Sequence, residues 1–140
     1  MTNEIQIGEH SVCFESDTGF SVLRCRGKVD ESEAIAINDA VIKNYLERVG
    51  RGQSFFCLVD VRHLTSVTPE ARRAIANGGR MGERACVAVV GGSFAIRVLL
   101  NLILKAMLLA SDQLVAVAVP EEDEARAWLA ERRRAFLASR

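Results

Sequence analysis

The sequence predicts an α/β fold with four helices and a mixed, mostly parallel five-stranded sheet, in the order β-β-α-β-α-β-α-β-α. Short apolar runs of strand length alternate with longer segments whose apolar residues recur at helical spacing. Such alternation is typical of parallel strands joined by right-handed helical crossovers. The length of 140 residues suits one hydrophobic core. We therefore expect a single domain over residues 1–140, with helices mainly on one face of the sheet.

The first two strands are expected to form an antiparallel hairpin. Runs of alternating character at residues 11–15 and 20–26 flank Asp17-Thr18-Gly19, a triplet that favours a turn. Gly27 is expected to end the second strand of the hairpin, because a glycine often marks the end of a regular run.

The first helix is expected to begin after Asp30, which suits the N-cap position, with Glu33 as its capping-box partner. It extends to residue 49, and Gly50 or Gly52 ends it. Its inward stripe is predicted to be Ile35, Ile37, Val41, Ile42, Tyr45, Leu46 and Val49.

A continuous apolar run at residues 54–61 predicts a strand that is covered on both faces. A loop that contains His63 is expected to follow this strand. The next helix is predicted from Pro69 to about Asn77, with Thr68 as its N-cap, and Gly78-Gly79 is expected to end it.

Residues 85–90 predict another buried strand, and Gly91-Gly92-Ser93 leads from it into a helix over residues 94–109. That helix is apolar over most of its circumference, apart from a narrow polar stripe. The stripe consists of Arg97, Asn101 and Lys105.

Ser111-Asp112 is expected to break this helix before a last strand at residues 114–119. The final helix begins at Pro120, because an acidic first turn follows it. Its predicted inward residues are Ala125, Trp128, Leu129, Phe136 and Leu137.

Composition excludes several classes of protein. Eighteen basic and eighteen acidic residues cancel, so no global charge favours nucleic acid or an anionic membrane. The polar N-terminus lacks the features of a secretory signal, and no uninterrupted apolar run is long enough for a membrane span. The four cysteines lie in strand-like runs without metal-binding spacing, so we expect reduced, buried thiols in a cytoplasmic protein.

The central segment FFCLVDVRHLTSVTPEARRAI, at residues 55–75, resembles that of STAS domains, the anti-sigma-factor-antagonist family. Val59-Asp60-Val61 matches the family's apolar-Asp-apolar triplet at the end of a strand. The segments VVGGSFAIR and EDEARAWLAERR resemble bacterial SpoIIAA-like proteins, a STAS-like group related in shape to CRAL-TRIO lipid-binding domains. The resemblance covers nearly the whole chain through its order of elements.

The resemblance implies a non-catalytic regulatory module that binds a protein partner and needs no cofactor. The region equivalent to the family's phosphoacceptor is Thr68, Pro69 and Glu70. The serine that accepts phosphate in phosphoregulated members is replaced here by residues that cannot be phosphorylated. Thr68 and Ser66 keep hydroxyl groups, and the N-cap role is the favoured interpretation of Thr68.

Two places carry residues that could support chemistry. Asp60 and His63 could act as acid and base at the carboxyl end of a strand, but no nucleophile motif accompanies them. The turn Gly91-Gly92-Ser93, with Arg97 one helical turn further on, could bind an anion. Ordinary helix capping by Ser93 also explains that turn. We predict no catalytic residue and no metal site.

The apolar helix over residues 94–109 leaves three interpretations open. It is core of the monomer, or a homodimer face, or the wall of a pocket for an apolar, lipid-like ligand. The leading hypothesis is a self-associating STAS-like module. Its interface is predicted to contain Phe94, Leu100, Leu104, Met107 and Leu108.

Overall fold

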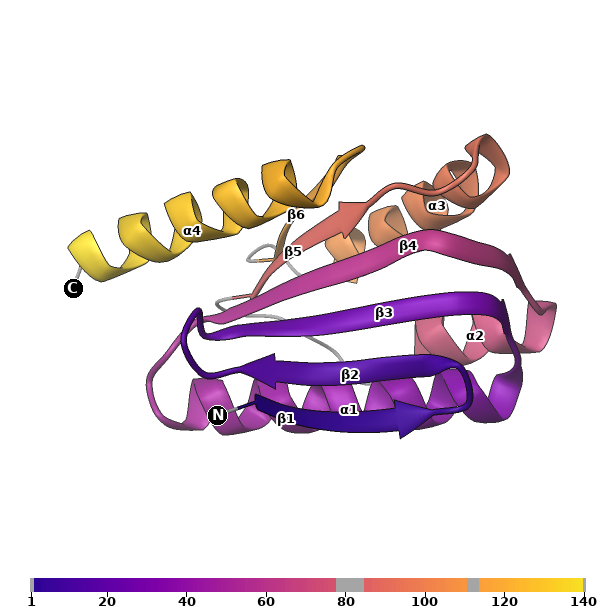
Figure 1. Ribbon diagram of the computed structural model, residues 1–140, viewed down its shortest axis with the longest axis horizontal. Coiled ribbons are helices and arrows are strands. Elements are labelled where there is room, and N and C mark those ends of the chain that lie inside the picture. Colours follow the sequence, from indigo (N-terminus) through magenta and orange to yellow (C-terminus); the bar gives the residue numbers. More distant parts are fainter. Residues whose placement is uncertain (1, 78–84, 111–113, 140) are drawn as a thin grey trace.

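The computed structural model describes residues 2–77, 85–110 and 114–139 and has the predicted α/β architecture. A six-stranded sheet runs in the order β1-β2-β3-β4-β5-β6 (Figure 1). β1, β2 and β3 are antiparallel, whereas β3 to β6 are parallel. The strands are β1 (Thr2–Ile7), β2 (His10–Glu15), β3 (Phe20–Val29), β4 (Phe55–Val67), β5 (Ala85–Val90) and β6 (Leu114–Val119).

The predicted number of five strands was one too low, because β1 was not anticipated. Its sequence, TNEIQI, has no continuous apolar run, and its residues 3–6 are exposed. The strand exists because its backbone pairs with β2 along the whole of its length. Backbone pairing of this kind does not require apolar side chains, so the composition of this edge strand did not reveal it.

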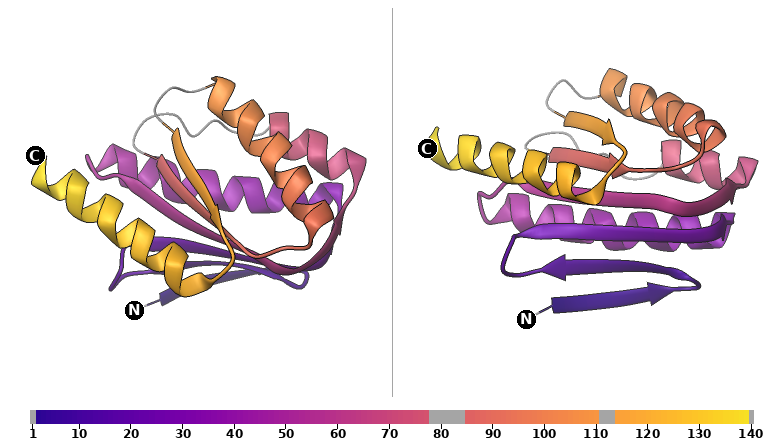
Figure 2. Two further views of the ribbon diagram at one scale, coloured as in Figure 1. Left: turned by 90° about the horizontal axis from the view of Figure 1, so that it is seen from above. Right: turned by 45° about the horizontal axis from the view of Figure 1, so that its top comes forward.

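Four helices cover the sheet from both sides (Figure 2). Their bounds are α1 (Glu31–Gly50), α2 (Pro69–Asn77), α3 (Phe94–Ala110) and α4 (Glu122–Ala138). The first three pack on one face, and their cluster of buried residues includes Ile37, Ala71 and Ile96. α4 lies on the opposite face, where Ala125 and Leu129 are fully buried.

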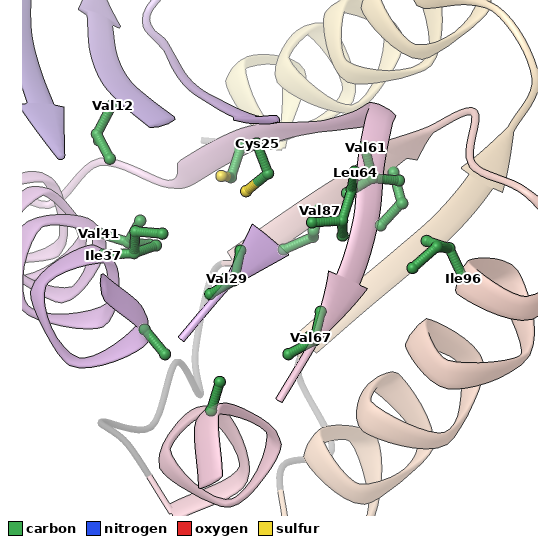
Figure 3. Close-up of a cluster of buried hydrophobic side chains, with 14 of the residues drawn as sticks. Val12, Cys25, Val29, Ile37, Val41, Val61, Leu64, Val67, Val87 and Ile96 are labelled. Atoms are coloured by element: carbon green, nitrogen blue, oxygen red, sulfur yellow. The ribbon is translucent and has the colours of Figure 1, made fainter. Parts of the chain in front are cut away.

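The core of the first face is built mainly from valine and other small side chains. Figure 3 shows Ile37 and Val41 of α1 and Ile96 of α3 directed toward strand residues such as Val61 and Val87. At the other end of α1, the ring of Tyr45 meets Phe55 edge to face, with ring centroids 5.6 Å apart. Three helices and the sheet thereby share one continuous apolar layer.

α1 begins as predicted, because Asp30 and Glu33 form a reciprocal capping box. The Asp30 carboxylate accepts the Glu33 N–H at 2.9 Å, and the Asp30 N–H donates to Glu33 Oε1 at 3.1 Å. Two residues of the predicted inward stripe, Ile35 and Leu46, are instead exposed. The inward arc of α1 is narrower than expected, because its buried positions follow a single line, Ala34, Ile37, Val41 and Tyr45.

Two strands, β3 and β4, continue beyond the ends that the sequence predicted. β3 passes through Gly27, whose φ is +66°, and continues to Val29; the extra residues at the two register shifts of this stretch lie on β4. β4 continues through the expected loop to Val67, because residues 63–67 pair with the extended part of β3. His63 therefore lies on a strand. The polar character of these residues obscured a strand whose inward positions are Val61, Leu64 and Val67.

His10 contacts the irregular stretch of β3 around Gly27 from inside the protein. Its side chain is fully buried, and Nδ1 accepts the Arg26 N–H at 3.1 Å. Nε2 donates to the Lys28 carbonyl at 3.2 Å and lies 3.3 Å from Glu33 Oε2. A single imidazole thus joins β2, the β3 backbone on both sides of Gly27 and the first turn of α1.

α2 begins at Pro69 as predicted, and the strands β5 and β6 match the predicted ranges. α4 begins at Glu122 rather than at Pro120. Leu137, a predicted inward residue, is exposed, because α4 extends beyond the strands that it covers. The predicted breaks at Gly78-Gly79 and Ser111-Asp112 lie outside the described residues.

Replacing His10 should destabilise the protein much more than replacing His63. His10→Ala leaves the Arg26 N–H and the Lys28 carbonyl without their buried partner, so we expect a loss of about 1–3 kcal/mol in the free energy of unfolding. His63 is exposed, so His63→Ala should change it by less than about 0.5 kcal/mol. Urea unfolding followed by circular dichroism measures both. Equal effects of the two substitutions would contradict the proposed role of His10.

Candidate functional site

A network of charged side chains joins α4 to the sheet at the middle of β4. Asp60 is buried, and its carboxylate accepts hydrogen bonds from Arg24 Nη1 at 2.7 Å and from Arg62 Nε and Nη2 at 2.9 Å. Glu122, the first residue of α4, accepts from the same two arginines at 2.8 and 2.9 Å. We call the whole set the charge network; it consists of Glu15, Arg24, Asp60, Arg62, Glu122 and Arg126.

The arginines of the charge network keep its carboxylates ionised. Burial by itself raises the pKa of Asp60, but hydrogen bonds from Arg62 and Arg24 outweigh burial and hold that pKa well below its usual range. Hydrogen bonds from Arg24 and Arg126 lower the pKa of Glu122 to about 2. Arg126 likewise lowers the pKa of Glu15. At neutral pH these groups serve as fixed negative charges rather than as proton acceptors.

Asp60 and His63, which the sequence offered only as a possible acid–base pair, do not contact each other in the structure. The hydrogen bonds of the Asp60 carboxylate come from Arg24 and Arg62, and His63 is an exposed residue on β4 that pairs with Arg26. Within the described residues no bond connects Asp60 to His63. The sequence did not indicate the charge network, since its members are up to 111 positions apart. The only signal for it was an aspartate inside an apolar strand.

The Gly91-Gly92-Ser93 turn lies directly against the charge network. Gly91 has φ +74°, and a β-carbon there would lie 2.3 Å from Arg62 Cγ, so glycine leaves the space that Arg62 occupies. The Gly91 N–H donates to the Val119 carbonyl, and the Ser93 hydroxyl accepts the Ile96 N–H as an N-cap. Arg97 Nε donates to the Gly92 carbonyl. Anion binding at this turn stays a prediction.

The phosphoacceptor-equivalent region forms an ordinary helix start. The Thr68 hydroxyl accepts the Ala71 N–H at 3.1 Å, which is N-cap geometry, and Pro69 is the first residue of α2. Glu70 is exposed and lies 3.9 Å from Arg73. The Thr68 N–H donates to the Val29 carbonyl, so this helix start is tied to the end of β3.

α3 carries an exposed apolar stripe along its outer side. Phe94, Val98 and Leu102 are 83%, 45% and 63% exposed, and their spacing of four places them in one line. We call these three residues the outer stripe. Leu100, a predicted interface residue, instead packs inward against the core. The side chains of Leu104, Met107 and Leu108 lie outside the part of the chain that the structure describes.

An apolar cavity of about 150 Å³ lies between the sheet, α1 and α3. Its wall includes Leu23, Cys57 and Val87 from the strands, Ile37 from α1, and Leu100 and Ile103 from α3. Asn38 also borders the cavity, but its side-chain amide donates to the Ala74 carbonyl. Cys25 and Cys57 face this region, and burial raises the pKa of each thiol to about 12. Both thiols are therefore unreactive at neutral pH.

The described residues include no cluster of three metal-binding side chains. They also include no helix that is long and apolar enough to cross a membrane.

Removing the Glu122 charge should change how stability depends on pH. A carboxylate whose folded pKa is lowered stabilises the protein above its unfolded pKa of about 4.3, and this contribution is lost as pH falls toward about 2. Glu122→Gln should therefore lower the free energy of unfolding by about 1–3 kcal/mol at pH 7, and the difference from wild type should shrink toward pH 2. Urea unfolding over this pH range measures the effect. Glu121→Gln, which removes an adjacent charge outside the network, is the control; a pH-independent difference for Glu122→Gln would contradict the argument.

A family model described as SpoIIAA-like matches residues 21–130. Among solved structures, an uncharacterised DUF3478-family protein with a SpoIIAA-like fold from Shewanella loihica PV-4 is 13% identical to the chain. The alignment covers 92% of both chains, with a TM-score of 0.49. No curated protein matched the chain. Because the family model covers well over half of the sequence, this protein belongs to the SpoIIAA-like family and is a STAS-like domain.

Proposed function

We propose that the protein is a non-catalytic regulatory module of the cytoplasm that acts through protein contacts and associates with a second copy of itself through α3. The observation that carries this proposal is the outer stripe of Phe94, Val98 and Leu102. A SpoIIAA-like domain is in general a protein-interaction module, and an uncovered apolar line on a helix is a common form of isologous interface.

The outer stripe is large enough to matter energetically. In a two-fold dimer, six apolar side chains would lose their remaining exposure to water. Full burial of a wholly exposed apolar side chain is worth about 1.5–3 kcal/mol, and the gain is smaller for Val98 and Leu102, which are already partly covered. This gain is of the same order as the cost of association, about 4–15 kcal/mol. Arg97, Asn101 and Lys105 are exposed beside the outer stripe. They would form the polar rim that surrounds the apolar centre of such interfaces.

The charge network supports the non-catalytic part of the proposal. Its carboxylates are held ionised by arginines, and Asp60 is buried beneath them. A general base needs a pKa near the working pH and access to substrate. The network instead provides a rigid attachment for α4.

Charging the outer stripe should separate the dimer without unfolding the monomer. Leu102→Glu places a carboxylate in the proposed interface, so we expect a mass of one chain in light scattering at a concentration where wild type is dimeric. Leu46→Glu is the matched control, because Leu46 on α1 is 61% exposed, against 63% for Leu102. A monomeric wild type, or equal dissociation of both variants, would rule the interface out.

A small apolar ligand is a second candidate, because the cavity wall is almost entirely apolar. Its volume of about 150 Å³ is below the roughly 300–1,000 Å³ of typical ligand pockets. Apolar cavities of about 150 Å³ stay dry and accept molecules the size of benzene. The observed cavity therefore suits a ring or a short apolar group rather than a whole lipid chain.

Benzene should shift the methyl resonances of Val87 and Val89, which line the cavity. We expect saturable shifts in wild type and at least about tenfold weaker binding in Ala34→Leu, which adds carbons to the cavity wall. Leu46→Glu, far from the wall, serves as the control. Absence of saturable shifts in the wild-type protein would eliminate this candidate.

A further inference from the structure

Two arginine side chains from opposite faces of the sheet meet at the β2–β3 turn. Gly19 in this turn has φ +77° and is buried. A β-carbon at Gly19 would lie 3.2 Å from Arg48 Nη2 of α1 and 3.8 Å from Arg133 Nε of α4. Since α1 and α4 cover different faces, their guanidinium groups converge at this end of the sheet. Arg51, one residue beyond α1, adds a third positive charge beside Arg48.

These three arginines form no ion pair with a carboxylate in the part of the chain that the structure describes. Within the described residues, the ion pairs involve Arg24, Arg62, Arg73, Arg126 and Arg134, but not Arg48, Arg51 or Arg133. Glu47 and Asp17 border the adjoining hollows, and neither forms an ion pair with them. The positive charges at the Gly19 turn are therefore uncompensated at ion-pair distance.

Arg48 carries a buried donor without an acceptor. Its Nε atom is buried and has no hydrogen-bond partner, while its guanidinium stacks on the Phe14 ring, 4.8 Å from the centroid. Burial, followed by the charges of Arg51 and Arg133, lowers the pKa of Arg48. Arginine nevertheless stays protonated in proteins. Repulsion between Arg48 and the charges of Arg51 and Arg133 therefore persists unless an anion binds between them.

The surface at this turn has room for such a group. A hollow of about 90 Å³ adjoins Arg48 and Arg51, and an open hollow of about 400 Å³ adjoins Arg133, Asp17 and Thr18. The planar guanidinium fork matches the oxygens of a phosphate, and arginines held on separate helices supply several donors to one anion. Phe14 fixes the plane of Arg48, which reduces the entropy lost on binding.

We propose that Arg48, Arg51 and Arg133 form a binding site for a phosphate-type oxyanion at the Gly19 turn. The site is separate from the outer stripe of α3 and from the Gly91-Gly92-Ser93 turn. A bound dianion would bridge α1 and α4 around the end of the sheet.

Inorganic phosphate is the probe, added to the full chain at constant ionic strength while the arginine Nε–H resonances are recorded. The Arg48 and Arg133 resonances should shift together and saturate. Arg133→Gln should weaken binding at least about tenfold, and it should not disturb the fold because Arg133 is exposed. Arg48→Gln should weaken binding similarly.

Arg132→Gln is the matched control, because Arg132 precedes Arg133 on α4 but stacks on Trp128. It should leave phosphate affinity unchanged. Absence of saturable shifts, equal weakening by Arg132→Gln and Arg133→Gln, or equal affinity for acetate and phosphate would each overturn the proposal. If Arg48→Gln does not fold, Arg133→Gln still decides the outcome.

Discussion

One buried carboxylate, Asp60, connects the middle of the sheet to the start of α4 through two arginines. A buried charge is expensive unless it is paired and hydrogen-bonded. Arg24 from the neighbouring strand and Arg62 from the same strand supply those bonds. Two arginines around one carboxylate leave an excess positive charge, which Glu122 of α4 balances. The start of α4 is therefore fixed by electrostatics as well as by the burial of Ala125 and Leu129.

The same arrangement determines where α3 begins. Arg62 passes so close to Gly91 that a β-carbon could not fit there, and the positive φ at Gly91 and Gly92 turns the chain into α3. The Gly91 N–H also bonds to the end of β6, which leads into α4. The starts of α3 and α4 are thus connected through the contacts of Arg62, Gly91 and the end of β6. We therefore expect a substitution at Asp60 or Gly91 to disturb the packing of both α3 and α4, which lie on opposite faces of the sheet.

Sequence patterns predicted the features that arise from neighbouring residues. The capping box of Asp30 and Glu33, the hairpin turn at Gly19 and the apolar run of β5 each depend on a few consecutive positions. The edge strand β1, the extension of β4 and the charge network depend instead on partners distant in sequence. Their residues are mostly polar, so hydrophobic periodicity did not reveal them. Leu100 was predicted to lie at an interface but packs inward. Because α3 is apolar around nearly all of its circumference, its composition does not distinguish the inner side from the outer side.

The exposed stripe and the cavity have a common cause in the position of α3. α3 lies over the parallel part of the sheet, where the facing residues are mostly valines and other small side chains. Its inward residues, among them Ile96 and Leu100, meet that layer without filling the space between α3 and α1. Its outer stripe has no further layer of the described chain to cover it. Closer packing of α3 could fill the cavity but would still leave Phe94, Val98 and Leu102 in water. Within the described residues, the stripe is therefore the feature that closer packing of α3 leaves exposed, and the proposed second copy would bury it.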